Sequence, residues 1–312
     1  MHSSYVIRRL LQIIPLFLAV MVLIFVLVHL IPGDPVSAQL GDRATPDKVA
    51  RANRELGLDK PLLFQFALFV NQTLHGNLGE SITLKVPVIR LVAERLPVTL
   101  FLTTYAAVLG VVMAVPLAVL AAVRRNTWMD GLIRGAFQFG LSLPVFYVAL
   151  QLLSLLGARL GWFPIGGYGE GFGGHLYALF LPALALGLNL AAILLRTLRS
   201  SVIEVLTAEY VEFARAKGLK TRVIMTRHVL RNAMIGTVTL LGLNIGALIG
   251  GAVITETVFA IPGVGRLMVD AIFGRDYPVV QGLTLVFAVL VSLVFLATDL
   301  LHARLDPRAE VA

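Results

Sequence analysis

Six long uncharged apolar stretches constrain this chain more than any other feature of its sequence. Residues 98–123 contain no charged side chain, and similar runs occupy 10–30, 135–158, 176–195, 233–254 and 278–298. About twenty apolar residues are enough for a helix to cross the hydrocarbon core of a bilayer. Because backbone amides find no water in that core, such segments must be helical. The sequence therefore predicts an all-α integral membrane protein with six transmembrane helices.

The amino-acid composition excludes the class of soluble globular domains. Hydrophobic residues make up 58% of the 312 residues and charged residues only 14%, whereas about a quarter of a typical soluble domain is charged. A net charge of +8 would suit nucleic-acid binding in a soluble chain, but here membrane orientation explains the basic residues at the span ends. We expect a lipid bilayer as a partner and no nucleic acid. The chain has no cysteine, which excludes disulfides and thiolate metal sites.

The distribution of lysine and arginine predicts which side of the membrane each loop occupies. Six spans place both termini on one side. The loops of that side carry fifteen basic residues: two ahead of the first span, three between the second and third, eight in 196–232 and two in the tail. The opposite side carries three, Arg159, Arg266 and Arg275, once the long first loop is left out as the positive-inside rule requires. We expect both termini and residues 196–232 to be cytoplasmic.

Turn residues and polar stretches divide the chain into segments. Residues 1–9 are expected to be a cytoplasmic N-terminus, followed by the first span and, after two prolines at 32–35 that stop its helix, by a small external subdomain at 31–97. Helix-like pieces of this subdomain lie at 47–56, 61–74 and 86–96. The main membrane domain covers 98–308 with the other five spans, and 309–312 are a C-terminal tail. Pro144 predicts a kink in the third span.

The segment 196–232 is charged although both of its neighbours are apolar. It carries eight basic and three acidic residues, so it cannot lie in the hydrocarbon core. Apolar Leu206, Tyr210 and Phe213 recur at steps of three and four, which predicts a helix, and Gly218 follows where a left-handed C-terminal cap belongs. Such a short helix offers a rigid surface to another protein, with Tyr210 and Phe213 as apolar anchors. The alternative interpretation is a loop whose charges only orient the chain.

Motifs for catalysis or nucleotide binding are absent from the sequence. It contains no His-Glu-x-x-His, no Gly-x-Ser-x-Gly and no Gly-x-x-x-x-Gly-Lys-Ser/Thr, which disfavours a membrane enzyme and excludes a P-loop. Uphill transport would draw its energy from an ion gradient or from a partner protein. An ion-coupled secondary transporter or channel is the alternative function, disfavoured because no chain of buried ionisable residues crosses the spans. We expect no cofactor or metal in this chain.

Gly242, Gly246 and Gly250 recur every four residues in the fifth span. A small residue at this spacing exposes backbone along one helix face and lets a second helix approach closely. Two interpretations remain open for this helix-packing face: packing within the chain, or contact at a subunit interface.

Several short motifs in and around the charged segment are shared with one family. Glu212, Ala214 and Gly218 resemble the Glu-Ala-Ala-x-x-x-Gly loop of permease subunits of bacterial binding-protein-dependent ABC importers, with Phe213 in place of the first alanine. The dipeptide and oligopeptide branch, which includes nickel and glutathione importers, has motifs similar to EYVEFARAKGL from 209, RHVLRNA from 227, TETVFAIPGVGRL from 255, DYPVVQG from 276 and LDPR from 305. The first of that branch's two permeases resembles this chain at PGDP from 32, ELGLDKPLLFQF from 55 and GNLGES from 76.

The resemblance implies a multi-pass protein of the bacterial inner membrane that forms half of a translocation pathway for peptides or similar small solutes. The implied partners are a second, homologous permease, two cytoplasmic P-loop ATPases that hold ATP and Mg²⁺, and an external substrate-binding protein. Residues 196–232 would contain the coupling helix, which seats in a groove of an ATPase. The ATPase-docking residues would be Tyr210, Glu212, Phe213, Ala214, Arg215, Lys217 and Gly218.

Overall fold

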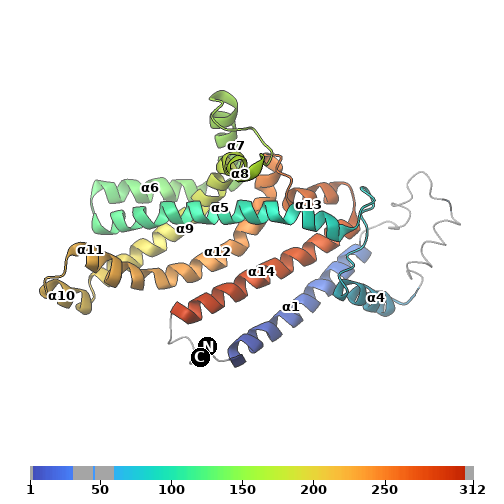
Figure 1. The fold of residues 1–312 in the computed structure, drawn as a ribbon, viewed down its shortest axis with the longest axis horizontal. Coiled ribbons are helices and arrows are strands. Elements are labelled where there is room, and N and C mark those ends of the chain that lie inside the picture. The colour runs from blue at the N-terminus through green and yellow to red at the C-terminus, as the bar shows by residue number, and fades with distance from the viewer. Residues whose placement is uncertain (1–2, 31–44, 46–59, 306–312) are drawn as a thin grey trace.

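Most of the helices lie lengthwise beside one another in the computed structural model (Figure 1), which describes residues 3–30, 45 and 60–305. Within those residues the regular structure is helical, apart from an isolated antiparallel bridge between Glu80 and Pro87. The elements are α1 Ser3–Leu30, α4 Leu62–Leu74, α5 Val88–Val123, α6 Trp128–Ser142, α7 Val145–Leu152, the π-helical η2 Leu153–Arg159, α8 Gly171–Ala178, α9 Phe180–Leu206, α10 Glu209–Ala216, α11 Thr221–Val223, the π-helical η3 Ile224–Leu230, α12 Arg231–Val258, α13 Val264–Phe273 and α14 Tyr277–Leu305. The turn expected at 32–35, the piece expected at 47–56 and the tail beyond 305 lie outside the described residues.

Helices long and apolar enough to cross a membrane dominate the described part of the chain. Four qualify on their own: Val88–Val123, Phe180–Leu206, Thr221–Val258 and Tyr277–Leu300. The pair Trp128–Ser142 and Val145–Arg159 makes a fifth if both halves count as one span. In α1 the apolar stretch found among the described residues is Ile14–Leu27. The expected class, a helical membrane protein, is confirmed.

Helix α5 is longer than the span expected at 98–123. It begins at Val88, so most of the piece expected at 86–96 is the first part of the same helix, with Pro97 inside it. A proline inside a helix frees one carbonyl and usually breaks the helix. Pro97 is exposed, however, near the end of the helix where a freed carbonyl can bind water or a lipid headgroup. The helix therefore continues through the residue that was expected to separate two elements.

The third expected span, 135–158, is two helices rather than one kinked helix. α6 ends at Ser142 and α7 begins at Val145, and their axes differ by 103°. Leu143 has ψ of 134° and Pro144 has ψ of 139°, so both are extended. A proline disfavours helical geometry in the residue before it, which accounts for the break at Leu143.

Helices α9 and α12 carry their spans well into the charged segment. α9 runs to Leu206, past the end expected at 195, and therefore holds Arg196 and Arg199. α11, η3 and α12 form one continuous helix of 38 residues, which is about 57 Å long at 1.5 Å per residue. This length exceeds the roughly 30 Å of the hydrocarbon core, so charged residues can occupy the ends of these helices. The short helix α10 lies between the two helix ends (Figure 1).

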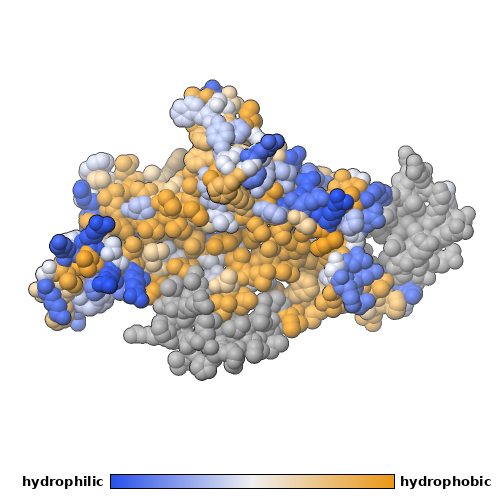
Figure 2. Space-filling view, viewed as in Figure 1, coloured by the Kyte–Doolittle hydropathy of each residue, from blue (hydrophilic) through white to orange (hydrophobic). Residues whose placement is uncertain are grey.

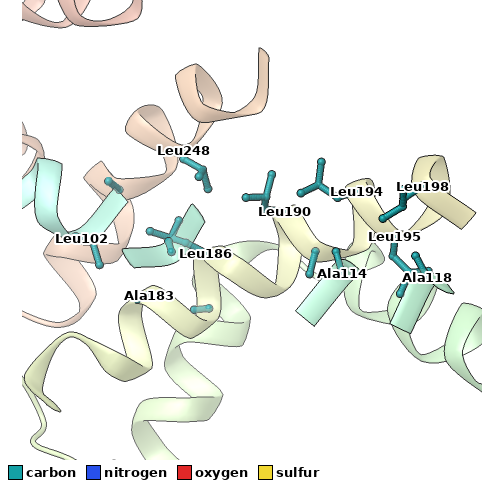
Figure 3. Packing of buried hydrophobic residues seen from close by; sticks show 14 of the residues in the cluster. Leu102, Ala114, Ala118, Ala183, Leu186, Leu190, Leu194, Leu195, Leu198 and Leu248 are labelled. Atoms are coloured by element: carbon teal, nitrogen blue, oxygen red, sulfur yellow. The ribbon is translucent and has the colours of Figure 1, made fainter. Parts of the chain in front are cut away.

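The main core lies where α5 crosses α9. Leu186, Leu190, Leu194 and Leu198 follow one another along α9, and Ala114 and Ala118 of α5 lie beside that helix (Figure 3); all six are buried. The backbones come close because both helices present glycine: a Cβ on Gly187 would lie 2.9 Å from the carbonyl oxygen of Ala106. Small residues are the usual means by which membrane helices approach each other. This crossing fixes the position of α9, which leads into the charged segment.

Smaller apolar clusters join the remaining helices to this core. Val88 of α5, Val264 of α13 and Leu283 of α14 share one cluster, and Met21 of α1 meets Leu285 of α14 in another. In Figure 2 an apolar band covers the middle of the molecule, and hydrophilic residues gather near α10 and α11 at one end and near α4 and α13 at the other. This distribution is that of a protein whose middle lies in a bilayer.

Candidate functional site

The charged segment 196–232 presents α10 at one extremity of the molecule (Figure 1), where hydrophilic side chains gather (Figure 2). α10 runs Glu209–Ala216 and buries only Val211 and Ala214, which join the main core cluster together with Leu198 of α9 and Val229 of η3. The helix is therefore amphipathic and is seated on its own chain by one narrow apolar face.

The outward face of α10 carries most of the residues predicted to dock an ATPase. Glu212, Arg215 and Lys217 are exposed, and Phe213 is 68% exposed, which is unusual for an aromatic side chain at a water-facing helix end. Such an exposed ring beside charged groups suits an apolar anchor for a partner protein. Ala214 differs from the prediction because its side chain faces the core of its own chain and is not available to a partner.

Gly218 follows α10 in the conformation that the sequence predicts. Its φ is +76°, and the N–H groups of Gly218 and Leu219 donate to the carbonyls of Arg215 (2.9 Å) and Ala214 (3.3 Å). A left-handed residue of this kind closes the last turn of a helix and costs a non-glycine residue free energy. A Cβ at Gly218 would meet nothing within 4 Å, so backbone conformation rather than crowding favours glycine there.

Tyr210 is partly engaged with its own chain. It is exposed, but its hydroxyl accepts a hydrogen bond of 3.1 Å from the amide of Asn232, whose amide also donates to the carbonyl of His228 at 2.8 Å. This contact joins α10 to the start of α12. Tyr210 therefore both positions α10 and borders its outward face.

An ion pair that sequence reasoning missed lies beside this segment. Asp130, in the first turn of α6, is 0% exposed and receives two hydrogen bonds of 2.7 Å from Nε and Nη2 of Arg199 on α9. The backbone N–H of Asn126 donates to the same carboxylate at 3.1 Å, and Arg134 lies 3.3 Å away with 55% of its side chain exposed. The only sequence signal was that Asp130 is the single acid among Arg124, Arg125 and Arg134.

A buried carboxylate organises the opposite end of the molecule. Glu256 of α12 accepts hydrogen bonds from the hydroxyl of Thr99 on α5 and from the N–H of Arg266 on α13 at 3.0 Å. The Thr99 hydroxyl in turn accepts from the N–H of Val264, the first residue of α13. A Cβ on Gly263 would overlap the Glu256 carboxylate, so the glycine leaves room for it. Glu256 therefore fastens the N-terminus of α13 to two spanning helices.

A second buried carboxylate holds the loop before α5. Asp276 accepts hydrogen bonds from the hydroxyl of Ser81 and from the N–H groups of Ile82 and Thr83, both at 3.1 Å. The segment 81–87 is thereby attached to the connection between α13 and α14. Neither Glu256 nor Asp276 has the partners of a catalytic acid or base, and each is satisfied by hydroxyl and backbone donors.

A largely apolar cavity of about 320 Å³ lies at the bend between α6 and α7, against α9. Its only side-chain amide comes from Asn189 of α9, and Pro144 is the residue at which the bend is made. The other lining residues are Ala136, Phe137, Gly140, Leu143, Val145, Val148, Ala185 and Leu188. Among the described residues, no group of three or more His, Cys, Asp or Glu side chains is arranged to hold a metal ion.

The glycine face of the fifth span is not uniform. A Cβ at Gly242 would overlap the side chain of Thr298 on α14, and a Cβ at Gly246 would lie 3.5 Å from the ring of Phe295 on the same helix. A Cβ at Gly250 would meet nothing within 4 Å. Two of the three glycines therefore face α14 within the chain, whereas Gly250 is open.

Comparison with known families gives matches over almost the whole chain. The family described as binding-protein-dependent transport system inner membrane component matches residues 114–311, and its N-terminal component matches residues 2–103. The glutathione transport system permease protein GsiC of Pectobacterium atrosepticum is 40% identical over 97% of this chain and 98% of its own length. A peptide transport system permease protein of Brucella melitensis is 38% identical over 99% of both chains.

Solved structures with a similar fold come from transporters of the same general kind. A methionine ABC transporter, MetNI, in an inward-facing conformation matches with a TM-score of 0.60 over 70% of this chain and 97% of the other, at 19% identity. An amino acid ABC transporter crystallised with histidines matches with a TM-score of 0.54 over 69% and 94% of the two chains, at 17% identity. These structures support the fold of the helical domain.

Proposed function

This chain belongs to the binding-protein-dependent transport system inner membrane components and is a permease subunit of an ABC importer, and from this membership we propose that it carries peptides or similar small solutes such as glutathione. The solute class rests on the names of relatives that are about 40% identical over nearly their full length. Transport assays with radiolabelled glutathione and with dialanine in cells that lack this chain test it. If cells that lack this chain take up both solutes as well as cells that have it, this solute class is refuted.

We further propose that the outward face of α10 docks in a groove of a cytoplasmic ATPase that holds ATP and Mg²⁺. The observation that carries the proposal is an exposed phenylalanine, Phe213, on a short helix seated on the core and closed by a left-handed glycine. A helix fixed at both ends transmits a push, whereas a flexible loop would absorb it. The complete importer would contain two such ATPases, a second, homologous permease and an external substrate-binding protein.

Charge reversal at Glu212 tests the docking surface. Glu212→Lys places a basic group on the outward face and should abolish uptake while leaving the amount of inserted protein unchanged. Glu204→Lys is the matched control, because Glu204 is also an exposed acid of the same segment but lies on α9 instead of α10. Normal uptake by Glu212→Lys would remove this residue from the docking surface.

The cap at Gly218 is tested by two substitutions that differ in their tolerance of positive φ. Gly218→Val forces a β-branched residue into φ of +76° and should reduce uptake, whereas Gly218→Asn should be tolerated because asparagine adopts that region more readily. Equal uptake by the two variants would show that the conformation at Gly218 is irrelevant to coupling.

For the topology we propose six spans, with α1 as the first and α6 and α7 together as the third, and with both termini and α10 in the cytoplasm. The support is the excess of lysine and arginine in the loops of that side. Because the chain has no cysteine, a maleimide can label a single introduced cysteine without background from native ones. A membrane-impermeant maleimide added outside should label Trp162→Cys and not Phe213→Cys, both of which are exposed sites. The reverse pattern would invert the topology.

A further inference from the structure

We propose that the buried pair Asp130–Arg199 is the positioning contact through which displacement of α10 reaches α6 and the bend at Pro144. The proposal rests on the proposed docking of an ATPase at α10. It concerns neither the docking surface nor the solute, but the path by which movement enters the membrane domain.

Arg199 lies near the C-terminal end of α9, the helix that leads into α10. It lies on α9 seven residues before Leu206, where that helix ends, which is about 10 Å along the helix axis. Only Thr207 and Ala208 separate α9 from the first residue of α10. α10 packs on η3, which in turn packs on α9, and Leu198, Val211 and Val229 belong to one core cluster, so η3 holds α10 beside the end of α9.

The geometry of the Asp130–Arg199 ion pair makes the contact rigid. Both hydrogen bonds of Arg199 to Asp130 are 2.7 Å long, and a bidentate guanidinium–carboxylate contact fixes orientation as well as distance. The Arg199 side chain is 17% exposed and that of Asp130 is 0% exposed, so separating the two would leave the buried carboxylate with only the N–H of Asn126 and the half-exposed Arg134 as partners. Such a separation is strongly unfavourable. When α9 moves, the start of α6 must therefore follow.

α6 packs on the main core through Ile133 and Phe137, and another of its faces is open. A Cβ at Gly131 or Gly135, which lie four residues apart on that face, would meet no atom within 4 Å in the described part of the chain. At its far end, the cavity of about 320 Å³ separates parts of α6 and α7 from α9. A helix held firmly at one end and bordered by empty space at the other can tilt. The tilt changes the bend at Pro144 and the volume of the cavity.

The test uses the complete transporter, with both permeases, both ATPases and the binding protein, in proteoliposomes. Two quantities are measured: radiolabelled glutathione imported per ATP hydrolysed, and the ATP-dependent change in distance between spin labels at Phe139→Cys on α6 and Ile254→Cys on α12, both exposed sites. For Arg199→Gln we expect the import ratio to fall by about twofold to thirtyfold, the range that substitutions between coupled sites produce, and the distance change to disappear. If the contact served stability alone, Arg199→Gln would lower the amount of transporter and would change neither the import ratio nor the distance change.

Arg134→Gln is the matched control. Arg134 also contacts Asp130, but it lies on the same helix and cannot link α6 to α9. It should leave the import ratio and the distance change as in the unmodified transporter. Equal losses in Arg134→Gln and Arg199→Gln would overturn the proposal, because removal of any neighbouring charge would then suffice.

The double variant Asp130→Asn/Arg199→Gln keeps the test decisive if Arg199→Gln fails to fold. Removing both charges leaves no uncompensated charge in the interior, so the variant should insert and assemble. We expect its import ratio and distance change to be lost all the same. Unmodified values in this variant, or failure to assemble, would overturn the proposal. If the unmodified transporter imports no glutathione, the solute proposal fails, and the distance measurement, which needs only ATP and Mg²⁺, still decides the role of the pair.

Discussion

Replacing Gly242 by alanine should destabilise the protein, whereas the same change at Gly250 should not. A Cβ at Gly242 would overlap the Thr298 side chain, including its Cβ at 2.5 Å, which no change of rotamer can move. Overpacking of this kind costs about 1–3 kcal/mol, and we take about 3 because the obstruction is rigid. Alanine regains about 1 kcal/mol of helix propensity. The net expectation for Gly242→Ala is a loss of about 2 kcal/mol in the free energy of unfolding.

The assay is the midpoint of thermal unfolding of the purified protein in detergent, followed by size-exclusion chromatography. A loss of about 2 kcal/mol corresponds to a midpoint about 4–8 °C lower, on the scale of soluble chains of 150–250 residues. Gly246→Ala places its Cβ 3.5 Å from Phe295, an ordinary contact, and should change the midpoint little. The Cβ of Gly250→Ala would meet no neighbour, so this variant should leave the midpoint of thermal unfolding unchanged or slightly raised.

A compensating change tests the geometry directly. Thr298→Gly removes the three atoms nearest to a Cβ at position 242, so Gly242→Ala/Thr298→Gly should be more stable than the two separate losses predict by about 3 kcal/mol, the overpacking that is relieved. An unchanged midpoint for Gly242→Ala, or additive losses in the double variant, would refute the packing of α12 on α14. A loss for Gly250→Ala equal to that for Gly242→Ala would contradict the open space beside Gly250.

Three further variants probe the helix contacts. Gly187→Val should prevent insertion or assembly, measured by membrane immunoblotting, because even a Cβ there lies 2.9 Å from the Ala106 carbonyl of α5. Glu256→Ala leaves the hydroxyl of Thr99 and the first N–H groups of α13 without their acceptor, and should increase proteolysis of the α12–α13 connection by an added protease, while Glu256→Gln should retain partial protection. Asp276→Ala should increase labelling of a single cysteine at Thr83 by an external maleimide, because two N–H groups and one hydroxyl of that loop lose their acceptor.

Local chemistry was enough to predict the features that depend on neighbouring residues. The left-handed cap at Gly218 and the short helix before it follow from a helical pattern that stops at a glycine, and both are present. The apolar runs predicted helices of membrane-spanning length, since hydrophobicity and length alone decide that class. Pro144 correctly marked an interruption, although its size, 103°, depends on how α7 packs and could not be read from one residue.

Features that depend on contacts distant in the sequence could not be predicted. Asp130 and Arg199 are 69 residues apart, and each alone reads as an ordinary charge near a membrane surface. The inward orientation of Ala214 depends on which side of α10 meets the core. The role of Glu256 could not be predicted either, because the sequence does not show that α13 turns its first N–H groups toward it. In each case the deciding partner belongs to another helix.

The attachment of the loop before α5 to Asp276 has a consequence for the order of synthesis. Ser81 and its acceptor are separated by 195 positions, so the ribosome completes the loop long before it makes the aspartate. At about 5–20 residues per second, the interval is roughly 10–40 seconds. During that time the donors of the loop can bind only water or other proteins. The end of the permease that holds this loop is therefore among its last parts to be finished, and a nascent chain arrested before residue 276 exposes an unfinished loop to the proteases that remove incomplete membrane proteins.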